Sequence, residues 1–162
     1  MADFEFLELE HDGRLTIITI NRPDVYNALH PPAHFEFEAV FDDFASDPEQ
    51  WVAIITGAGD KAFSAGNDLK YTAQGGKGSM PDTGFAGLSS RFDLEKPIIA
   101  AVNGFAMGGG FEIALSCDIV LAADTATFAL PEVKVGLFAA AGGVQRLSRQ
   151  IGRKPAVEIM LT

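Results

Sequence analysis

The longest apolar stretch of the chain, residues 97–115, constrains the fold more than any other feature. Only Asn103 and Glu112 are polar within it, and its length would suffice for one membrane-spanning helix. However, the stretch opens with Pro97 and carries three consecutive glycines at residues 108–110, which interrupt a continuous helix. We therefore expect two short buried elements joined by a tight turn within a globular domain, and not a membrane span.

Short β-branched runs alternate with helical patterns along the rest of the chain. Buried or half-buried strands are predicted at residues 4–10, 15–20, 51–56, 98–102 and 119–123. Helices are predicted at residues 31–46, 85–94 and 109–116, and two more lie within 142–162, the second opening near Pro155. The order strand–helix–strand–strand recurs without a sequence repeat, which indicates an α/β fold of stacked ββα units.

The first of these helices, at residues 31–46, has an apolar side that we expect to face the core. Pro31 and Pro32 open it, and its predicted buried residues are Phe35, Ala39, Val40 and Phe44.

The charge balance and the cysteine content exclude several classes of protein. Twelve Lys and Arg against 22 Asp and Glu give a net charge of −10, whereas nucleic acids and anionic membranes require a basic face. The single Cys117 cannot form an internal disulfide, which favours a reducing compartment. The length of 162 residues suits one domain, or most of one.

Residues 71–84 form the one loose segment, rich in glycine and poor in apolar side chains. Two interpretations stay open: a mobile surface loop, or a loop that becomes ordered over a ligand.

A triple glycine before a helical run, at residues 108–110, exposes backbone N–H groups that no Cβ covers. The first turn of a helix has free donors, and its dipole favours negative charge there. Glu112 follows inside an apolar segment, where burial raises the pKa of a carboxyl and suits it to acid–base work. The structural alternative is tight strand–helix packing with a glutamate that reaches solvent. Glu132, after Pro131, also makes an ordinary helix start, and its interest is as a second carboxylate facing Glu112.

Three other sites are weaker matches. Residues 62–66 imitate a nucleophile elbow, but all three histidines precede Ser64, whereas that arrangement needs a later histidine. Residues 57–62 imitate a dinucleotide fingerprint, but the residues after them do not form its helix. His30 and His34 have the spacing of metal ligands, but two prolines separate them and no third ligand is near in sequence, so we expect no metal site.

Four stretches together resemble the crotonase family, the enoyl-CoA hydratase/isomerase superfamily. They occur in the family's order and cover most of the chain: Asn21-Arg-Pro with Asn27-Ala-Leu, Ala62-Phe-Ser-Ala-Gly-Asn-Asp-Leu-Lys, Lys96-Pro-Ile-Ile-Ala-Ala-Val-Asn-Gly-Phe-Ala-Met-Gly-Gly-Gly-Phe-Glu, and Phe128-Ala-Leu-Pro-Glu with Gly142-Gly-Val-Gln-Arg-Leu. Within the family, residues 63–70, 84–88 and 108–112 are similar to carnitinyl-CoA dehydratases as well as to general hydratases. The resemblance implies a crotonase-like superhelix of ββα units.

The resemblance also implies roles for individual residues. The backbone N–H groups of Asn67 and Gly109 would form an oxyanion hole for a thioester carbonyl. Glu112 and Glu132 match the two catalytic glutamates of hydratases, with Glu112 as general base on water and Glu132 as the acid that protonates Cα.

Contacts with coenzyme A follow from the same resemblance. The implied substrate-binding residues are Val25, Tyr26, Ala28, Ala65, Asp68, Leu69 and Lys70. Because the chain is acidic, local cations are needed for an anionic ligand, and the candidates are Arg22, Lys61, Lys70 and Lys77. Two residues depart from the family pattern: Asp24 stands where relatives often have a basic residue, which we expect to weaken CoA binding, and Ala139 replaces a common proline.

The implied activity is that of an enoyl-CoA hydratase, a hydro-lyase of fatty acid β-oxidation. The alternatives are a carnitinyl-CoA dehydratase or another acyl-CoA reaction of the family, and a non-catalytic CoA-binding or interaction fragment. We expect residues 1–162 to be a crotonase-like core without the family's C-terminal helical region. We also expect a cytoplasmic protein, a homotrimer or hexamer at full length, an acyl-CoA partner with no nucleic acid or membrane, and no cofactor besides the thioester substrate.

Overall fold

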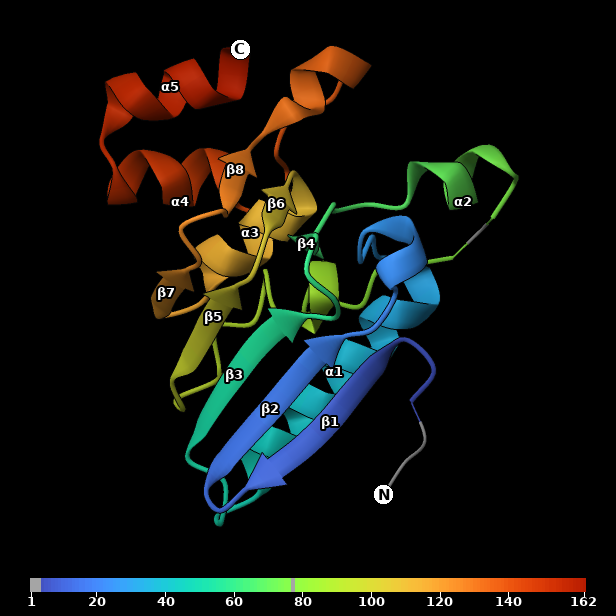
Figure 1. Cartoon of the computed structure of the whole chain (residues 1–162), viewed down its shortest axis with the longest axis vertical. Coiled ribbons are helices and arrows are strands. Elements are labelled where there is room, and N and C mark those ends of the chain that lie inside the picture. The colour runs from blue at the N-terminus through green and yellow to red at the C-terminus, as the bar shows by residue number, and fades with distance from the viewer. Residues whose placement is uncertain (1–3, 77) are drawn as a thin grey trace.

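A computed structural model describes residues 4–76 and 78–162 and contains two β-sheets with helices around them (Figure 1). The larger sheet has the strand order β1-β2-β3-β5-β7, with bounds Leu7–Asp12, Leu15–Ile20, Val52–Gly57, Ile98–Val102 and Ile119–Ala122. Only β1 and β2 pair antiparallel; the other neighbours are parallel. The smaller sheet is parallel, with the order β4-β6-β8 and bounds Ala62–Ser64, Phe105–Met107 and Thr127–Ala129.

The chain passes between the two sheets three times. β3 is followed by β4 and by α2 (Leu69–Ala73), and β5 is followed by β6 and by α3 (Gly109–Ser116). The third pass, β7 then β8, ends in the 3-10 helix η3 (Pro131–Val135). Each pass therefore adds one strand to each sheet, which confirms the expected stacked ββα units.

The parallel register of the smaller sheet determines where the site forms. Ser64 in β4 pairs with Ala106 in β6, and Ala106 pairs with Phe128 in β8. Because parallel strands end at the same edge of a sheet, the segments that follow these three strands emerge together. These segments lie within three of the four stretches that carry the family resemblance.

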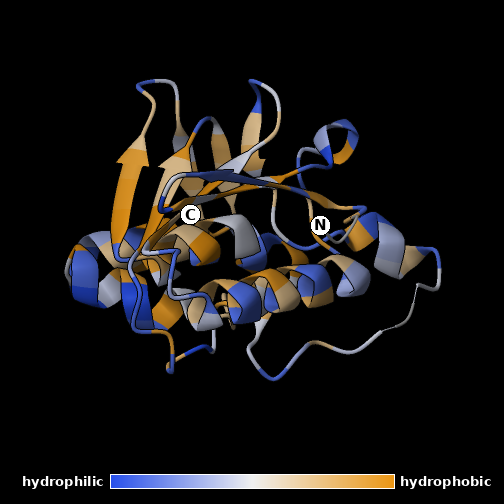
Figure 2. Cartoon of the chain, turned by 90° about the horizontal axis from the view of Figure 1, so that it is seen from below, coloured by the Kyte–Doolittle hydropathy of each residue, from blue (hydrophilic) through white to orange (hydrophobic). Residues whose placement is uncertain are grey.

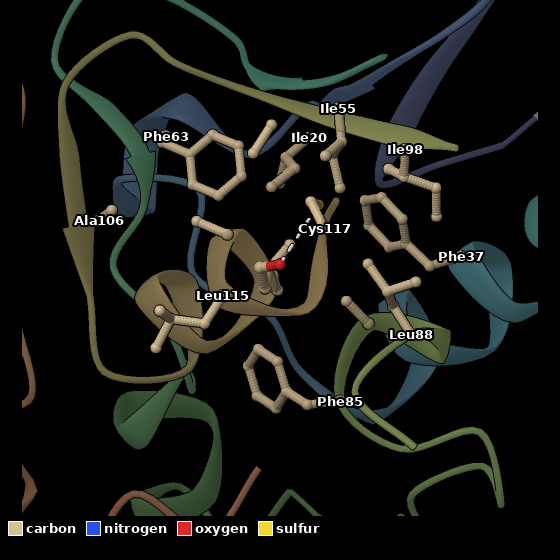
Figure 3. Close-up of a cluster of buried hydrophobic side chains, with 14 of the residues drawn as sticks. Ile20, Phe37, Ile55, Phe63, Phe85, Leu88, Ile98, Ala106, Leu115 and Cys117 are labelled. Atoms are coloured by element: carbon tan, nitrogen blue, oxygen red, sulfur yellow. Dashed lines mark hydrogen bonds between the residues drawn. The ribbon is translucent and has the colours of Figure 1, made fainter. Parts of the chain in front are cut away.

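The core lies between the larger sheet, α1 (Pro31–Ser46) and α3. Figure 3 shows Ile20, Ile55 and Ile98 of the sheet near Phe37 of α1, with Cys117 among them. Figure 2 shows hydrophobic residues concentrated along the strands and alternating with hydrophilic residues along the helices.

The buried face of α1 differs from the prediction. Val40 and Phe44 are buried as expected, but Phe35 and Ala39 are exposed. The buried residues repeat at helical spacing from Ala33 through Phe37 and Phe41. Phe35 is two positions from Ala33, which turns it to the opposite side of the helix.

Three other predicted elements need correction. The first strand begins at Leu7, not residue 4, because the Glu36 carboxylate accepts the N–H groups of Glu5 and Phe6. The predicted helix at 85–94 is only the 3-10 helix η2 (Phe85–Gly87). The strand predicted at 119–123 is β7, but it is exposed, since it is the last strand of the sheet in the part of the chain described.

The remaining elements agree with the prediction to within a few residues. The third strand is β3, one residue later than 51–56, and Trp51 before it is exposed. The C-terminal helices are α4 (Gly143–Gln150) and α5 (Arg153–Leu161), and a short 3-10 helix, η1 (Pro23–Val25), follows β2. The start of the loose segment at 71–84 belongs to α2. No helix within residues 4–76 and 78–162 is long and apolar enough to cross a membrane.

Candidate active site

A cavity of about 390 Å³ lies where the segments after β4, β6 and β8 meet. Asn67, Gly109, Glu112 and Glu132, the four residues singled out for the reaction, all line it. The structure therefore brings together residues from three passes of the chain that are up to 65 positions apart in sequence (67 to 132).

Two glycines, which carry no side chain, allow these segments to approach each other. A Cβ on Gly66 would lie 2.6 Å from the Met107 carbonyl oxygen and 2.8 Å from the Gly109 nitrogen. A Cβ on Gly110 would lie 2.0 Å from the carbonyl oxygen of Ser64. These distances are well inside van der Waals contact, so only glycine permits the backbone after β4 to lie against the start of α3.

The two predicted amide donors are held by different means. Gly109 is the first residue of α3, where an N–H has no acceptor within the helix. Beside Asn67, the Leu29 N–H donates to the Gly66 carbonyl at 2.7 Å, and the Asp68 N–H donates to the Leu29 carbonyl at 2.8 Å. In such a parallel bridge the N–H of the middle residue, Asn67, points to the side away from Leu29.

Glu112 lies in the first turn of α3 and is only 4% exposed. Its Oε1 accepts the Gly143 N–H at 2.8 Å. The pKa of Glu112 is raised to about 7, mainly by burial and also by the nearby charge of Glu132, although the Gly143 hydrogen bond opposes the shift. A carboxyl with this pKa exchanges protons readily near neutral pH.

Glu132 lies in η3, directly after Pro131, and faces the start of α3. Its Oε1 lies 3.0 Å from the place a Cβ on Gly108 would occupy. Its Oε2 is buried and makes no hydrogen bond with the described residues. Burial raises the pKa of Glu132 as well, so two carboxyls that both resist ionisation share one cavity.

The predicted CoA-contact residues lie around the start of α2 and η1, outside the cavity lined by the glutamates. Tyr26, with Asp24 and Lys61, lines a separate hollow of about 220 Å³. The Ala65 N–H donates to the Tyr26 carbonyl at 2.9 Å. Leu69 and Lys70 are exposed and Val25 is partly exposed, whereas Ala28 is buried.

Asp68 and Arg22 are engaged with each other. Arg22 Nη1 lies 3.0 Å from Asp68 Oδ2 and also donates to the Ala28 carbonyl. Asp68 Oδ1 accepts the Tyr71 N–H and so caps α2. Burial acts to raise the pKa of Asp68, but the Tyr71 and Arg22 hydrogen bonds outweigh it and lower the pKa. Arg22 is therefore paired with a carboxylate of the protein, which offsets its charge, and its role as a cation for the ligand stays a prediction. Lys77 lies outside the described residues.

Sequence reasoning missed several residues that line the cavity or support it. Gly143 donates its N–H to Glu112, and the paired glycines at residues 142–143, before the first of the two C-terminal helices, were the signal for this further amide donor. Phe85, the first residue of η2, and Ser89, which follows η2, form one wall of the cavity. Leu137 and Phe138 form another. The family resemblance covered Phe85, within residues 84–88, but gave it no role, and no local pattern indicated the other three residues, because they belong to irregular segments. Among the described residues, no group of three or more acidic, His or Cys side chains could hold a metal ion.

A spiral of ββα units with its cavity at the strand ends defines a protein of the crotonase class. The chain belongs to the enoyl-CoA hydratase/isomerase family, whose model matches residues 10–162.

Individual members of the family are similar to this chain over nearly all of its length. A carnitinyl-CoA dehydratase from Escherichia coli is 48% identical over 98% of this chain and 61% of its own length. The structure of a carnitinyl-CoA dehydratase from Mycobacterium avium is 45% identical, with a TM-score of 0.90 over 96% of this chain and 62% of that one. An enoyl-CoA hydratase structure from Mycobacterium tuberculosis is 40% identical, with a TM-score of 0.90 over 97% of this chain and 61% of that one. The chain thus spans about three fifths of the length of the relatives it matches.

Proposed function

We propose that the protein is an enoyl-CoA hydratase, which adds water across the double bond of a 2-enoyl-CoA thioester. The observation that carries the proposal is the pair Glu112 and Glu132, two buried carboxyls with raised pKa values on one cavity. Adding water to an alkene requires a base for the water and an acid for the adjacent carbon, and closely placed carboxyls can divide these roles.

In the proposed reaction the pair holds one proton between its two members. Glu112, whose ionised form is stabilised by the Gly143 N–H, removes a proton from water as the oxygen attacks Cβ. Glu132, whose buried Oε2 has no hydrogen-bond partner among the described residues, delivers a proton to Cα. The water supplies both the hydroxyl and the net proton, so the pair is restored once the proton passes from Glu112 to Glu132.

Attack at Cβ moves negative charge onto the thioester oxygen, which needs donors already in place. Asn67 and Gly109, whose N–H groups are the proposed donors, line the same cavity, and the dipole of α3 favours negative charge beside Gly109. One such donor contributes typically about 3–4 kcal/mol to transition-state stabilisation. The hollow beside Tyr26 and Lys61 is our candidate site for the coenzyme A moiety.

Carnitinyl-CoA dehydratase is the second candidate, since relatives with that name reach 48% identity. The proposed chemistry is the same pair of steps run in reverse on a substrate with a charged acyl end. The proposal also includes a place in fatty acid β-oxidation, a cytoplasmic location, no cofactor besides the thioester, and a trimeric or hexameric assembly.

A substrate panel tests the proposal. The protein, purified as it is naturally produced, is mixed with crotonyl-CoA or crotonobetainyl-CoA, and the loss of the conjugated thioester absorbance is followed. Faster turnover of crotonyl-CoA supports the hydratase, and faster turnover of crotonobetainyl-CoA supports the second candidate. A folded sample that binds CoA but turns over neither thioester indicates a non-catalytic CoA-binding protein.

A further inference from the structure

The loop from Gly84 to Ser90 forms one wall of the candidate site, and a histidine from α1 holds it. His34 is fully buried, and its Nδ1 accepts the N–H of Ala86 at 3.1 Å. Its ring also packs against the ring of Phe85, with the centroids 4.4 Å apart. α1 therefore contacts both the backbone and the aromatic side chain of this wall.

The backbone at this point needs an external partner. Ala86 has φ +54°, a left-handed conformation that a residue with a Cβ adopts only where its surroundings enforce it. The Phe85 N–H is bound by Ser89 Oγ at 2.8 Å within the loop. The Ala86 N–H is bound by His34, which lies 52 residues away in sequence.

The ring of Phe85 connects this wall to the proposed oxyanion site by direct packing. Figure 3 shows its ring pointing towards α3. A Cβ on Gly109 would lie 2.6 Å from Cζ of Phe85, so the ring rests directly on the Gly109 backbone. Both residues line the cavity with the glutamates.

The protonation state of His34 agrees with an acceptor role. Burial, with a smaller contribution from His30, lowers the pKa of His34 to about 4, so the ring is neutral near pH 7 and Nδ1 has a free lone pair. Nε2 is buried and makes no hydrogen bond with the described residues. The bond to Ala86 is thus what distinguishes this ring from an apolar side chain of similar size.

We propose that His34 is a positioning residue for the reaction, which fixes Phe85 against Gly109 and thereby the oxyanion-binding N–H of Gly109. The proposal rests on the proposed function, because it assigns His34 to the rate of thioester chemistry.

Four variants test the proposal. His34→Leu removes the acceptor, His34→Asn keeps an oxygen near the place of Nδ1, and His34→Gln keeps an amide but moves the oxygen outwards. We expect kcat on the better enoyl-CoA substrate to fall about 10- to 100-fold in the Leu and Gln variants, with KM changed less than about twofold, since small misplacements cost this much. The Asn variant should retain most of kcat. Phe44→Leu, about 15 Å further along α1, is the matched core control and should keep kcat even where Tm falls.

Two further measurements separate positioning from loss of stability. Amide hydrogen exchange at residues 84–88 should accelerate in the Leu and Gln variants and not in the Asn variant. In a double-mutant cycle, His34→Leu should have little effect in a Phe85→Leu background, because both changes act on one contact.

The outcomes are distinct from those that test the reaction itself. A wild-type kcat in both the Leu and Gln variants overturns the proposal, as does an Asn variant as slow as a folded Gln variant, or full additivity in the cycle. If the Leu variant does not fold, the comparison of Asn with Gln decides. Absence of turnover in the wild-type protein overturns the proposed function, and the role of His34 falls with it.

Discussion

Glu112 and Glu132 are chemically identical side chains whose surroundings differ. Glu112 is buried at the start of a helix and accepts one backbone N–H, whereas Glu132 has an oxygen with no partner among the described residues. Burial raises the pKa of both, and in Glu112 the neighbouring carboxylate adds to the rise. The proposed division into base and acid follows from this difference in hydrogen bonding.

Glu112→Gln and Glu132→Gln should each lower kcat by roughly 10²–10⁴-fold, the usual contribution of a positioned acid or base. CoA binding should stay nearly unchanged, because the predicted CoA contacts lie outside this cavity. Steady-state kinetics and CoA titration measure both effects, with exposed Glu158→Gln on α5 as the control. A wild-type kcat in either cavity variant would remove that glutamate from the mechanism.

Glu112→Gln should also change the pH dependence of stability. The pKa of Glu112 is about 7 in the folded chain and 4.5 in the unfolded one, so the folded chain holds more protons between these values. Stability therefore falls as pH rises through this window. The uncharged Gln avoids this loss, so the variant should exceed the wild type at pH 8 by up to about 3 kcal/mol, and by far less at pH 5. Urea unfolding at both pH values measures the difference; an equal difference at both would contradict it.

At the scale of elements, the site depends on how closely the backbone after β4 approaches α3. Gly66 and Gly110 leave no room for a Cβ at this junction. Both glycines therefore allow the packing of this junction, and through it they place the proposed amide donors.

Gly110→Ala should destabilise the fold by about 3 kcal/mol or more, because its Cβ would overlap the Ser64 carbonyl oxygen and neither backbone can move freely. Thermal unfolding measures the loss. Gly13→Ala is the control: it has φ +59° but no atom within 4 Å of the new Cβ, so only backbone strain of about 1–2 kcal/mol applies. An equal effect of the two substitutions would contradict the packing argument.

At the scale of the molecule, the larger sheet ends in an exposed apolar edge strand. β7 is its last strand in the described part of the chain, and Ile119, Val120 and Leu121 are all substantially exposed. An apolar edge strand offers free backbone donors and acceptors to another chain.

We therefore expect the 162-residue chain, expressed alone, to self-associate through β7. Val120→Lys should reduce this association, because a charge on an edge strand opposes pairing. Light scattering across a concentration series measures it. Val157→Lys, at a similarly exposed valine on α5, should leave association unchanged, and an equal reduction there would indicate a general effect of charge.

Local patterns in the sequence were sufficient for most elements and, among the four residues of the proposed reaction, for singling out Glu112 and the glycines before it. The strands of the larger sheet and α3 follow from β-branched runs and from the triple glycine before Glu112, since these signals act within a few residues. Assigning Glu132, Asn67 and Gly109 to a common site depended on resemblance to a family, and their meeting in one cavity was visible only in the tertiary structure.

The elements that were predicted wrongly depend on distant partners. The 85–94 segment has an apolar pattern, but His34 binds the Ala86 amide and allows a left-handed residue where a helix was expected. Likewise, the composition of β7 indicates a buried strand, yet burial depends on whether another element covers it. The amino-acid sequence alone determined which segments could form strands, helices and tight turns, because those preferences are local. Only the tertiary structure decided which amides, rings and carboxyls meet, because those contacts join residues tens of positions apart.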